Sequence, residues 1–215
     1  MRKQFNFLFI SLLFFFCSDA QTTWGIKAGI AINKQNSFQG ADKSALITEQ
    51  ASFFKIIPVH SSFILQPSIG YYPKGGRINN MTFEDQFGNP IGVGSLSFRF
   101  DYVELTIPFQ YLLTRHTTKL YSGIGPYLSY AISGKEKWRN VSGTSSNESN
   151  KGNIPFGSNG YKRVDAGFVI IFSALLKGKW IFSATYEAGF LNIYYSSQNE
   201  TNNFSGGLTI GYCFK

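Results

Sequence analysis

Charged residues are scarce in this sequence. They make up 15% of its 215 residues, against roughly 25% in an average soluble domain. Cysteine and histidine occur only twice each, and one cysteine lies in the N-terminal apolar run, so the remainder of the chain cannot form an internal disulfide. The sequence has no HExxH motif, no paired cysteines and no acidic calcium-binding loop. It therefore predicts neither a metal site nor a bound cofactor.

Long apolar runs are also missing, apart from one at the N-terminus. After the basic start MRK comes the run FNFLFISLLFFF, which at about 12 residues is too short to cross a bilayer as a helix. Small residues follow at Ser18 and Ala20, as a signal-peptide cleavage site requires. We expect a signal peptide at residues 1–20 and a mature domain at residues 21–215. The rival interpretation, a lipid on Cys17, lacks small residues at the two preceding positions.

Aromatic residues and glycine are abundant instead. The chain contains 22 Phe, 12 Tyr and 22 Gly, and its apolar residues show no helical period of useful length. Short apolar, β-branched and aromatic runs alternate with polar stretches, which is typical of β-strands. Eight strands are predicted, at about residues 22–33, 46–57, 62–74, 95–113, 119–132, 161–176, 179–195 and 203–215.

The predicted connections alternate between long loops and short turns. The long ones cover residues 34–45, 75–94 and 133–160, and the short ones cover residues 58–61, 114–118 and 177–178. Short turns at one end and longer loops at the other are typical of bacterial outer-membrane barrels, and an even number of strands leaves both termini at the short-turn end. The long loops are rich in Asn, Ser and Gly, as mobile surface loops are.

Successive side chains of a strand point to opposite faces, and here one face is bulky and the other small. In the last strand, Phe204, Leu208, Ile210, Tyr212 and Phe214 share one face, opposite Ser205, Gly207, Thr209, Gly211 and Cys213. An eight-stranded barrel has an interior barely wide enough for its own side chains, so the bulky face does not fit inside. A small polar face with few charges would coat a soluble, lipocalin-like barrel poorly. The sequence therefore predicts an all-β, eight-stranded antiparallel up-and-down transmembrane β-barrel.

Several charged residues share the inward phase of the predicted strands. Glu104, near the middle of the apolar run FDYVELTIPFQYLL, follows the phase of Tyr102 and Thr106 and so points into the lumen. The inward set contains three cations and three anions: Lys27, Lys55, Glu104, Arg163, Asp165 and Glu187. Because buried charges are tolerated only when they are paired and hydrogen-bonded, we expect a structural ion-pair network that fills the lumen.

Two residues of the same run fit the alternation less well. Asp101 falls in the lipid-facing phase, so we expect it either near the outer rim beside Arg99 or next to a bulge that shifts the register. Pro108 removes a ladder hydrogen bond from a strand with neighbours on both sides. A bulge or kink is therefore expected near Pro108.

Seven segments, taken in order, resemble the PorT-like outer-membrane β-barrel family: GIKAGI, LQPSIGYYPKGG, YVELTIPFQYLL, GIGPYLSY, VDAGF, YEAGFLNI and LTIGYCF. The resemblance covers nearly the whole predicted mature chain and implies a barrel in the outer membrane. Three positions depart from the family's pattern. Thr106 and Ser68 stand where relatives carry acids, and Lys215 follows the terminal aromatic residue that the barrel-insertion machinery reads. The family's namesake takes part in protein secretion and gliding, so the resemblance implies an accessory role of that kind.

Two classes of function remain open. The first is a structural or interaction barrel whose long loops bind a protein partner, and the second is a porin-like barrel that passes or binds small solutes. A rim-sited acyltransferase or hydrolase is a third hypothesis, opposed by the placement of His60 and His116 in predicted short turns. Outer-membrane lipids and the insertion machinery are expected partners. Nucleic acid is not, because the net charge of +8 is scattered without a run of five basic residues.

Overall fold

The computed structural model describes residues 22–36, 42–84, 87, 89–142, 149–157, 160–195 and 200–214. The predicted signal peptide at residues 1–20 lies outside this part of the chain. Among the described residues, no helix has the length and apolar character needed to cross a membrane. The strands belong to one antiparallel β-sheet.

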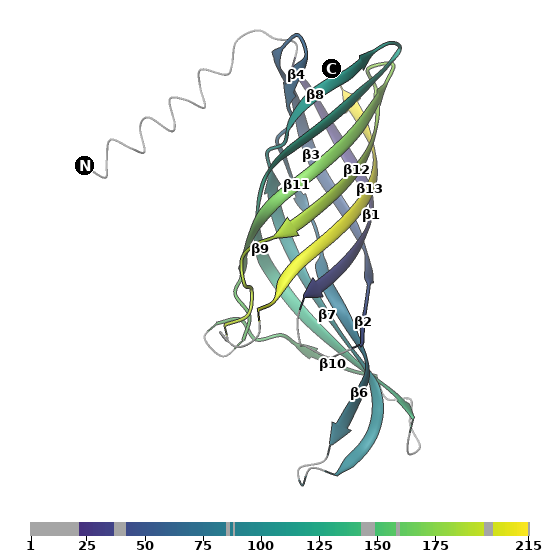
Figure 1. Cartoon of the computed structure of the whole chain (residues 1–215), viewed down its shortest axis with the longest axis vertical. Helices are drawn as coiled ribbons and strands as arrows, with labels where there is room; N and C mark the ends of the chain where they lie inside the picture. The colour runs from purple at the N-terminus through teal and green to yellow at the C-terminus, as the bar shows by residue number, and fades with distance from the viewer. Residues whose placement is uncertain are drawn as a thin grey trace, which may run out of the picture.

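The sheet closes on itself to form a barrel (Figure 1). Its first strand pairs with the last strand on one side and with β3 on the other, so the ring has no open edge. The ring has eight strands, two of which are interrupted, because β4 continues into β5 and β7 into β8. In the part of the chain described, the strands are β1 (Thr23–Asn36), β2 (Asp42–Ser44), β3 (Leu46–His60), β4 (Phe63–Leu65), β5 (Ser68–Tyr71), β6 (Lys74–Glu84), β7 (Pro90–Thr106), β8 (Phe109–Arg115), β9 (Thr118–Ser142), β10 (Ser149–Asn153), β11 (Val164–Leu176), β12 (Trp180–Gly189) and β13 (Asn202–Phe214).

Proline marks both interruptions of the ring. Pro67 separates β4 from β5, and Pro108 separates β7 from β8. Because proline has no N–H group to donate, each ladder stops before it and resumes after it. Gly125 on the neighbouring strand leaves room for the kink, since a Cβ atom there would lie 2.2 Å from the Ile107 carbonyl oxygen. The kink that the sequence predicts near Pro108 is confirmed.

Short turns lie at one end of the barrel, between β3 and β4, between β8 and β9, and between β11 and β12 (Figure 1). In the last of these, Lys177 and Gly178 have φ angles of 49° and 67°, the left-handed conformations of a type I′ hairpin turn. Trp24 near the start of β1 pairs with Phe214 at the end of β13. Cys213 donates its N–H to the Lys179 carbonyl, so the first strand begins and the last strand ends on the short-turn side, as predicted.

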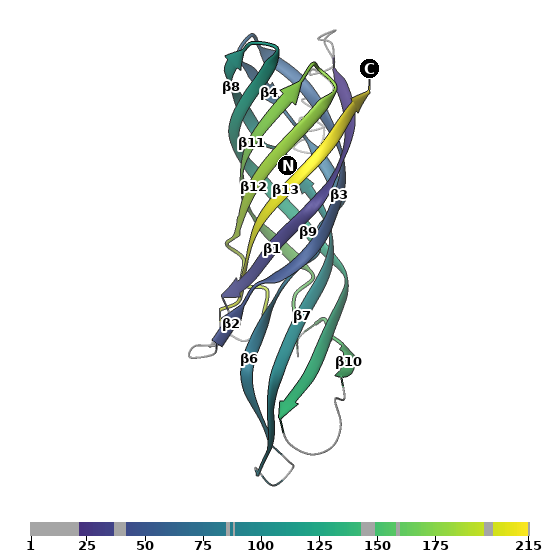
Figure 2. The same cartoon turned by 90° about the vertical axis from the view of Figure 1, so that its right-hand side faces the viewer.

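At the other end the sheet extends beyond the ring, which differs from the prediction of three long loops. Residues 34–45 include β2, residues 75–94 form a hairpin of β6 and β7, and residues 133–160 include the end of β9 and all of β10. Figure 2 shows β6, β7 and β10 reaching past the barrel. Abundant Gly, Ser and Asn hide the alternation in these segments. One face is nevertheless apolar and buried, with Ile78, Leu96 and Phe98.

The outer face of the ring is apolar and the inner face is mostly polar or small. In β7, Val103 and Leu105 are exposed, whereas Glu104 and Thr106 are buried, as the alternation predicts. Other exposed large side chains include Ile26, Ile30, Phe53, Ile124, Leu128, Phe168, Phe172, Phe182, Leu208 and Ile210. The outward orientation of the bulky face is therefore confirmed.

Aromatic residues with a polar group gather near both ends of this apolar band. Trp24, Trp180 and Tyr212 lie at the short-turn end, where Trp180 is paired with Tyr212. Tyr71 and Tyr130 lie at the opposite end, in a cross-strand row on either side of Val103. An apolar band between two aromatic girdles is the surface of a barrel that crosses a lipid bilayer.

Candidate functional site

A lysine and three carboxylates meet inside the barrel. The Lys74 Nζ lies 2.7 Å from Glu104 Oε2, 3.0 Å from Glu187 Oε2 and 3.8 Å from Asp165 Oδ2. All four side chains are almost completely excluded from solvent. The ammonium group also lies 3.7 Å from the centre of the Tyr127 ring, whose face attracts cations. We call these five residues the interior cluster.

Neutral donors add hydrogen bonds to two of the carboxylates. The Ser129 hydroxyl donates to Glu104 Oε2 at 2.6 Å. The Tyr127 hydroxyl and the Asn203 amide donate to Asp165 Oδ2 at 3.2 and 2.9 Å. Buried ion pairs offset their desolvation cost only when hydrogen bonds of this kind accompany the charge contact. Glu104 and Asp165 have both.

Strand register explains why these residues meet. Ser129 of β9 lies directly opposite Glu104 of β7 in one ladder and opposite Asp165 of β11 in the next, so the three inward side chains form one row. Glu187 projects from β12. Lys74, the first residue of β6, completes the cluster from across the lumen.

Lys74 is absent from the sequence-based prediction, because YYPKGGR resembles the end of a strand at a turn. The signal that could have identified it is alternation: Ser68, Tyr72 and Lys74 share one phase, and all three are buried. Ser68 and Thr106, which replace the acids of the PorT-like pattern, lie opposite each other with their hydroxyl oxygens 2.7 Å apart.

Lys27 of β1 lies inside the barrel, as predicted. Its Nζ is 6.0 Å from the centre of the Phe54 ring, and it makes no direct ion pair with any described residue. The charged side chains described inside the ring are two lysines and three carboxylates, rather than three of each sign: Lys27, Lys74, Glu104, Asp165 and Glu187.

Lys55 and Arg163 do not point into the lumen, and for these two residues the prediction is wrong. In β3 the buried phase is that of Ser52, Phe54 and Ile56, so Lys55 points outward, with its Nζ 4.8 Å from the Trp24 ring centre. Arg163 precedes the first residue of β11, where strand alternation does not yet apply. Its guanidinium donates to the Ala131 carbonyl and stacks 4.2 Å from the Phe156 ring.

Apolar side chains fill the lumen on both sides of the interior cluster. The turn-side cluster contains Phe54, Ile56, Ile64, Tyr121, Leu175, Ile181 and Cys213. The extension-side cluster contains Ile78, Leu96, Phe98, Phe100, Tyr102, Ala131, Ile154, Tyr161 and Ile193. Burial raises the pKa of the Tyr161 phenol, so this ring stays neutral within the apolar layer. Along the barrel axis, the described residues therefore form an apolar, an ionic and a second apolar layer.

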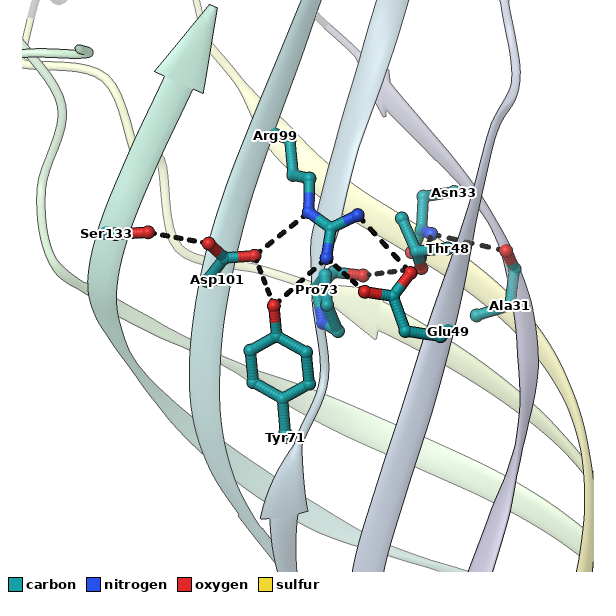
Figure 3. A network of polar contacts seen from close by, with 9 residues as sticks. All are labelled: Ala31, Asn33, Thr48, Glu49, Tyr71, Pro73, Arg99, Asp101 and Ser133. Carbon is teal, nitrogen blue, oxygen red and sulfur yellow. Dashed lines mark hydrogen bonds and ion pairs between the residues drawn. The ribbon is translucent and has the colours of Figure 1, made fainter.

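A second group of charged residues lies on the outer face, where the ring meets the extension (Figure 3). Arg99 of β7 forms a two-point ion pair with Glu49 of β3 and donates through Nε to Asp101 at 2.9 Å. Tyr71 and Ser133 also donate to Asp101, each at 2.6 Å. We call these five residues the outer cluster.

Asp101 keeps the outward phase of Arg99 and Val103 in β7, and a bulge in β9 places a serine opposite it. Asp101 pairs with Ser133 of β9, whereas the next residue, Tyr102, pairs with Ala131, so Ile132 is the extra residue of β9. Of the two explanations offered from the sequence, the position beside Arg99 accounts for Asp101. A bulge is present at this point, but it lies in β9 and leaves the phase of Asp101 unchanged.

No group of three or more His, Cys, Asp or Glu side chains within the described ranges is placed to hold a metal ion. His60 and His116 lie at the short-turn end, and both are exposed. The His60 Nδ1 contacts the hydroxyl of the adjacent Ser61 at 3.2 Å.

A family model described as "Outer membrane protein beta-barrel domain" matches residues 18–195 of this chain. No curated protein matches the sequence. The family match covers most of the chain and agrees with the closed ring and the apolar outer face.

Solved barrel structures resemble the whole ring at low sequence identity. The attachment invasion locus protein Ail of Yersinia pestis is 13% identical, with 91% of this chain and 100% of that chain covered and a TM-score of 0.47. Neisserial surface protein A is 11% identical, with the same coverage and a TM-score of 0.49. OprG of Pseudomonas aeruginosa is 10% identical, with 89% and 95% covered and a TM-score of 0.41. Similarities at this level concern the fold, and no ligand or activity is carried over.

Proposed function

Because the chain belongs to the outer membrane protein beta-barrel domain family and lies in the Gram-negative outer membrane, we propose that it acts there through contacts rather than through transport. The proposed role is structural or interactive. The barrel anchors the protein in the membrane, and the strands and loops that extend beyond it bind a protein partner.

The filled lumen is the observation that carries this proposal. Phe54 and Ile181 occupy the turn-side layer, Lys74 with its three carboxylates occupies the middle, and Phe100 and Tyr161 occupy the extension-side layer. An eight-stranded ring is only wide enough for its own side chains, and each layer here contains large ones. This arrangement favours a packed core over a path for solutes.

The extension supplies the surface for contacts. β6, β7, β9 and β10 continue past the outer cluster as a sheet with one buried and one exposed face. Its buried face belongs to the extension-side cluster, and its exposed face remains accessible.

Conductance in planar bilayers tests the filled lumen. We expect silent membranes after insertion of the purified, folded protein, with a general porin in the same membrane as the detection control. Well-resolved ion steps from the unmodified protein would overturn the proposal and favour the porin-like alternative.

Partner capture tests the interaction role. Thr82 pairs with Val93 near the tip of the β6–β7 hairpin, so residues 83–92 can be replaced with a two-residue Asn-Gly turn that suits the same register. This change leaves Ile78 and Leu96 of the extension-side cluster in place. Protein partners recovered with the intact chain are expected to be lost, while the folded barrel persists. Unchanged recovery would exclude the hairpin tip as the contact.

The PorT-like resemblance narrows the class of partner. We infer that a component of a secretion or gliding apparatus is the partner to seek first, since the motifs quoted above lie on ring strands, including GIKAGI on β1 and YVELTIPFQYLL on β7 and β8. Copurification from a native membrane extract, followed by identification of the recovered proteins, tests this. Recovery of unrelated envelope proteins alone would remove the secretion role and leave the interaction role standing.

No catalytic role is proposed. The contact between Ser61 and His60 joins adjacent residues of an exposed turn, at the end of the barrel opposite the extension. A structural turn contact accounts for it, and the two histidines lie away from the outer rim where the sequence analysis would have sited an acyltransferase or hydrolase.

A further inference from the structure

The exposed face of the extension is strongly basic. The register aligns Gly75, Arg99, Lys135 and Asn153 in one cross-strand row, and Arg77, Ser97, Lys137 and Lys151 in the next. A third row pairs Ser95 with Arg139. These rows contain six cationic and no acidic side chains, and we call the six the basic face: Arg77, Arg99, Lys135, Lys137, Arg139 and Lys151.

Five of the six cations lack an acidic partner among the described residues. Arg99 is paired with Glu49 and Asp101 of the outer cluster. Arg77 donates to the Ser97 hydroxyl at 3.1 Å. Glu136 is the acidic residue of β9 that lies nearest to these rows. It has the opposite strand phase and lies beside Gly152 on the other face.

Like charges stand directly opposite each other on this face. Lys137 pairs with Lys151, and Arg99 pairs with Lys135. Side chains at such positions are separated by about 5 Å at Cβ, and like charges there destabilise the sheet. The opposite face of the same strands is apolar and buried, with Leu96, Phe98 and Ile154, so packing fixes which face carries the cations. An anionic ligand across the rows would relieve the repulsion.

The basic face lies immediately above the membrane's apolar region. Val103 and Tyr130 are exposed members of the apolar band and of its aromatic girdle. Arg99 is four residues beyond Val103, which is about 13 Å along a strand and about 9 Å along the membrane normal at a strand tilt of about 45°. The headgroup layer of a bilayer begins where the hydrocarbon ends and is about 5–8 Å thick on each side. Long lysine and arginine side chains can reach back to this layer.

We propose that the basic face binds the phosphate groups of lipids in the outer leaflet. The ligand is a phosphorylated glycolipid or phospholipid held with its phosphates against Lys135, Lys137 and Lys151 and its acyl chains along the apolar band. The phosphates of such a molecule match the basic face in charge, and its acyl chains match the apolar band. A soluble polyanion would use the cations but would gain nothing from the adjoining apolar band. The proposal is independent of a protein partner, which we place at the hairpin tip.

Binding of diphosphoryl lipid A to the folded protein in neutral detergent micelles tests the proposal. The triple variant Lys135→Gln, Lys137→Gln, Lys151→Gln removes three charges while keeping polar side chains. We expect about fivefold weaker binding for each lysine removed and about a hundredfold for all three, from the usual contribution of a basic side chain at an anionic membrane surface. Dephosphorylated lipid A is expected to bind the unmodified protein as weakly as diphosphoryl lipid A binds the variant.

A matched control comes from the opposite end of the barrel. Lys119, Lys177 and Lys179 are equally exposed lysines at the short-turn end, and their replacement with Gln alters the net charge by the same amount. This control is expected to bind diphosphoryl lipid A like the unmodified protein. Heat-modifiable gel mobility confirms that both variants fold.

Two results would overturn the proposal. One is equal loss of lipid A binding in the two triple variants, which would mean a response to net charge alone. The other is binding of inorganic polyphosphate as tight as that of diphosphoryl lipid A, with the same sensitivity to the three substitutions. That outcome would make the basic face a site for soluble polyanions instead.

Discussion

The interior cluster and the outer cluster are built from the same parts in different surroundings. In each, one cation contacts two or more carboxylates, with tyrosine and serine hydroxyls as additional donors. Lys74 and Glu104 have side-chain exposures of 2% and 0%, whereas Arg99 and Glu49 have 33% and 63%. The comparison therefore isolates the effect of burial on an ion-pair cluster.

Burial changes the energy of each ion-pair contact more than differences in distance do. Two unit charges 4 Å apart interact by about 1 kcal/mol in water and about 4 kcal/mol at an effective dielectric constant of 20. The cost of removing each ion from water rises in the same way, so an interior ion left without its partner is strongly unfavourable. At the outer face, water and salt can replace a lost partner.

The identity of the cation suits each place. Lys74 carries a compact charge at the end of a flexible chain, which lets one ammonium group contact Glu104 of the neighbouring β7 and Glu187 of β12 on the opposite side of the ring. Arg99 carries a planar group that pairs with Glu49 through two nitrogens and with Asp101 through a third. The planar guanidinium group of Arg99 suits two carboxylates that lie side by side on a sheet. The compact ammonium group of Lys74 suits carboxylates that converge from several strands.

Lys74→Met is expected to have the largest effect. The side chain keeps all but the last atom of its length, but three carboxylates lose their shared cation within a region closed to water. We expect a loss of about 3–5 kcal/mol in the free energy of unfolding, measured by urea unfolding in detergent micelles and by heat-modifiable gel mobility. Lys119→Met, at an exposed position on the short-turn end, is the control and should change stability little. Equal midpoints for the two variants would contradict a stabilising interior cluster.

Glu104→Leu is expected to cost less than Lys74→Met, about 1–3 kcal/mol, because it removes one carboxylate from a group that outnumbers its cations. Lys74 keeps Glu187 at 3.0 Å, and the main loss is the acceptor of the Ser129 hydroxyl. Glu104→Gln retains an acceptor for Ser129 and should recover part of the loss. The same unfolding assay checks both. If Glu104→Leu destabilised the barrel as much as Lys74→Met, the interior would be balanced in charge, as the sequence alone suggested.

Alternation within long strands was enough to predict the ring and most of its interior. Glu104, Asp165 and Glu187 belong to the paired parts of β7, β11 and β12. The alternation of side chains along each strand therefore predicts that all three point into the lumen. The same rule gave the outward face of β13. These predictions depend only on local geometry, which one strand fixes by itself.

The errors occur where alternation begins, ends or is hidden. Arg163 stands one residue before β11, and Lys55 lies in β3, where buried Phe54 and exposed Phe53 make the two faces look alike. Lys74 follows a proline and precedes two glycines, a composition that favours a turn. Lys74 is the last residue of the strand predicted at residues 62–74, and its pairing with Phe100 shows that the strand continues past it.

The extension escaped prediction for a related reason. Its strands carry Gly, Ser and Asn between the cations of the basic face, so each segment alone resembles a loop. Only the pairing of β6, β7, β9 and β10 shows that Ile78, Leu96 and Phe98 share a buried face with Ile154. The extension-side cluster is assembled from five segments, namely β6, β7, β9, residues 154–161 and Ile193 after β12, and its existence depends on all of them at once.

Arg99→Gln is expected to have the smallest effect, because the outer cluster is partly solvated. Glu49 can turn to water, and Asp101 keeps the hydroxyl donors Tyr71 and Ser133. We expect a loss of up to about 1 kcal/mol in the free energy of unfolding. Raising the salt concentration from about 0.1 M to about 1 M shortens the screening length from about 10 Å to about 3 Å. The free energy of unfolding of the unmodified protein should then approach that of the Arg99→Gln variant. The difference in free energy caused by Lys74→Met should stay unchanged. A salt-independent loss of 3 kcal/mol or more for Arg99→Gln would show that lipid shields the outer cluster from water, and the contrast between the two clusters would then be one of position rather than of burial.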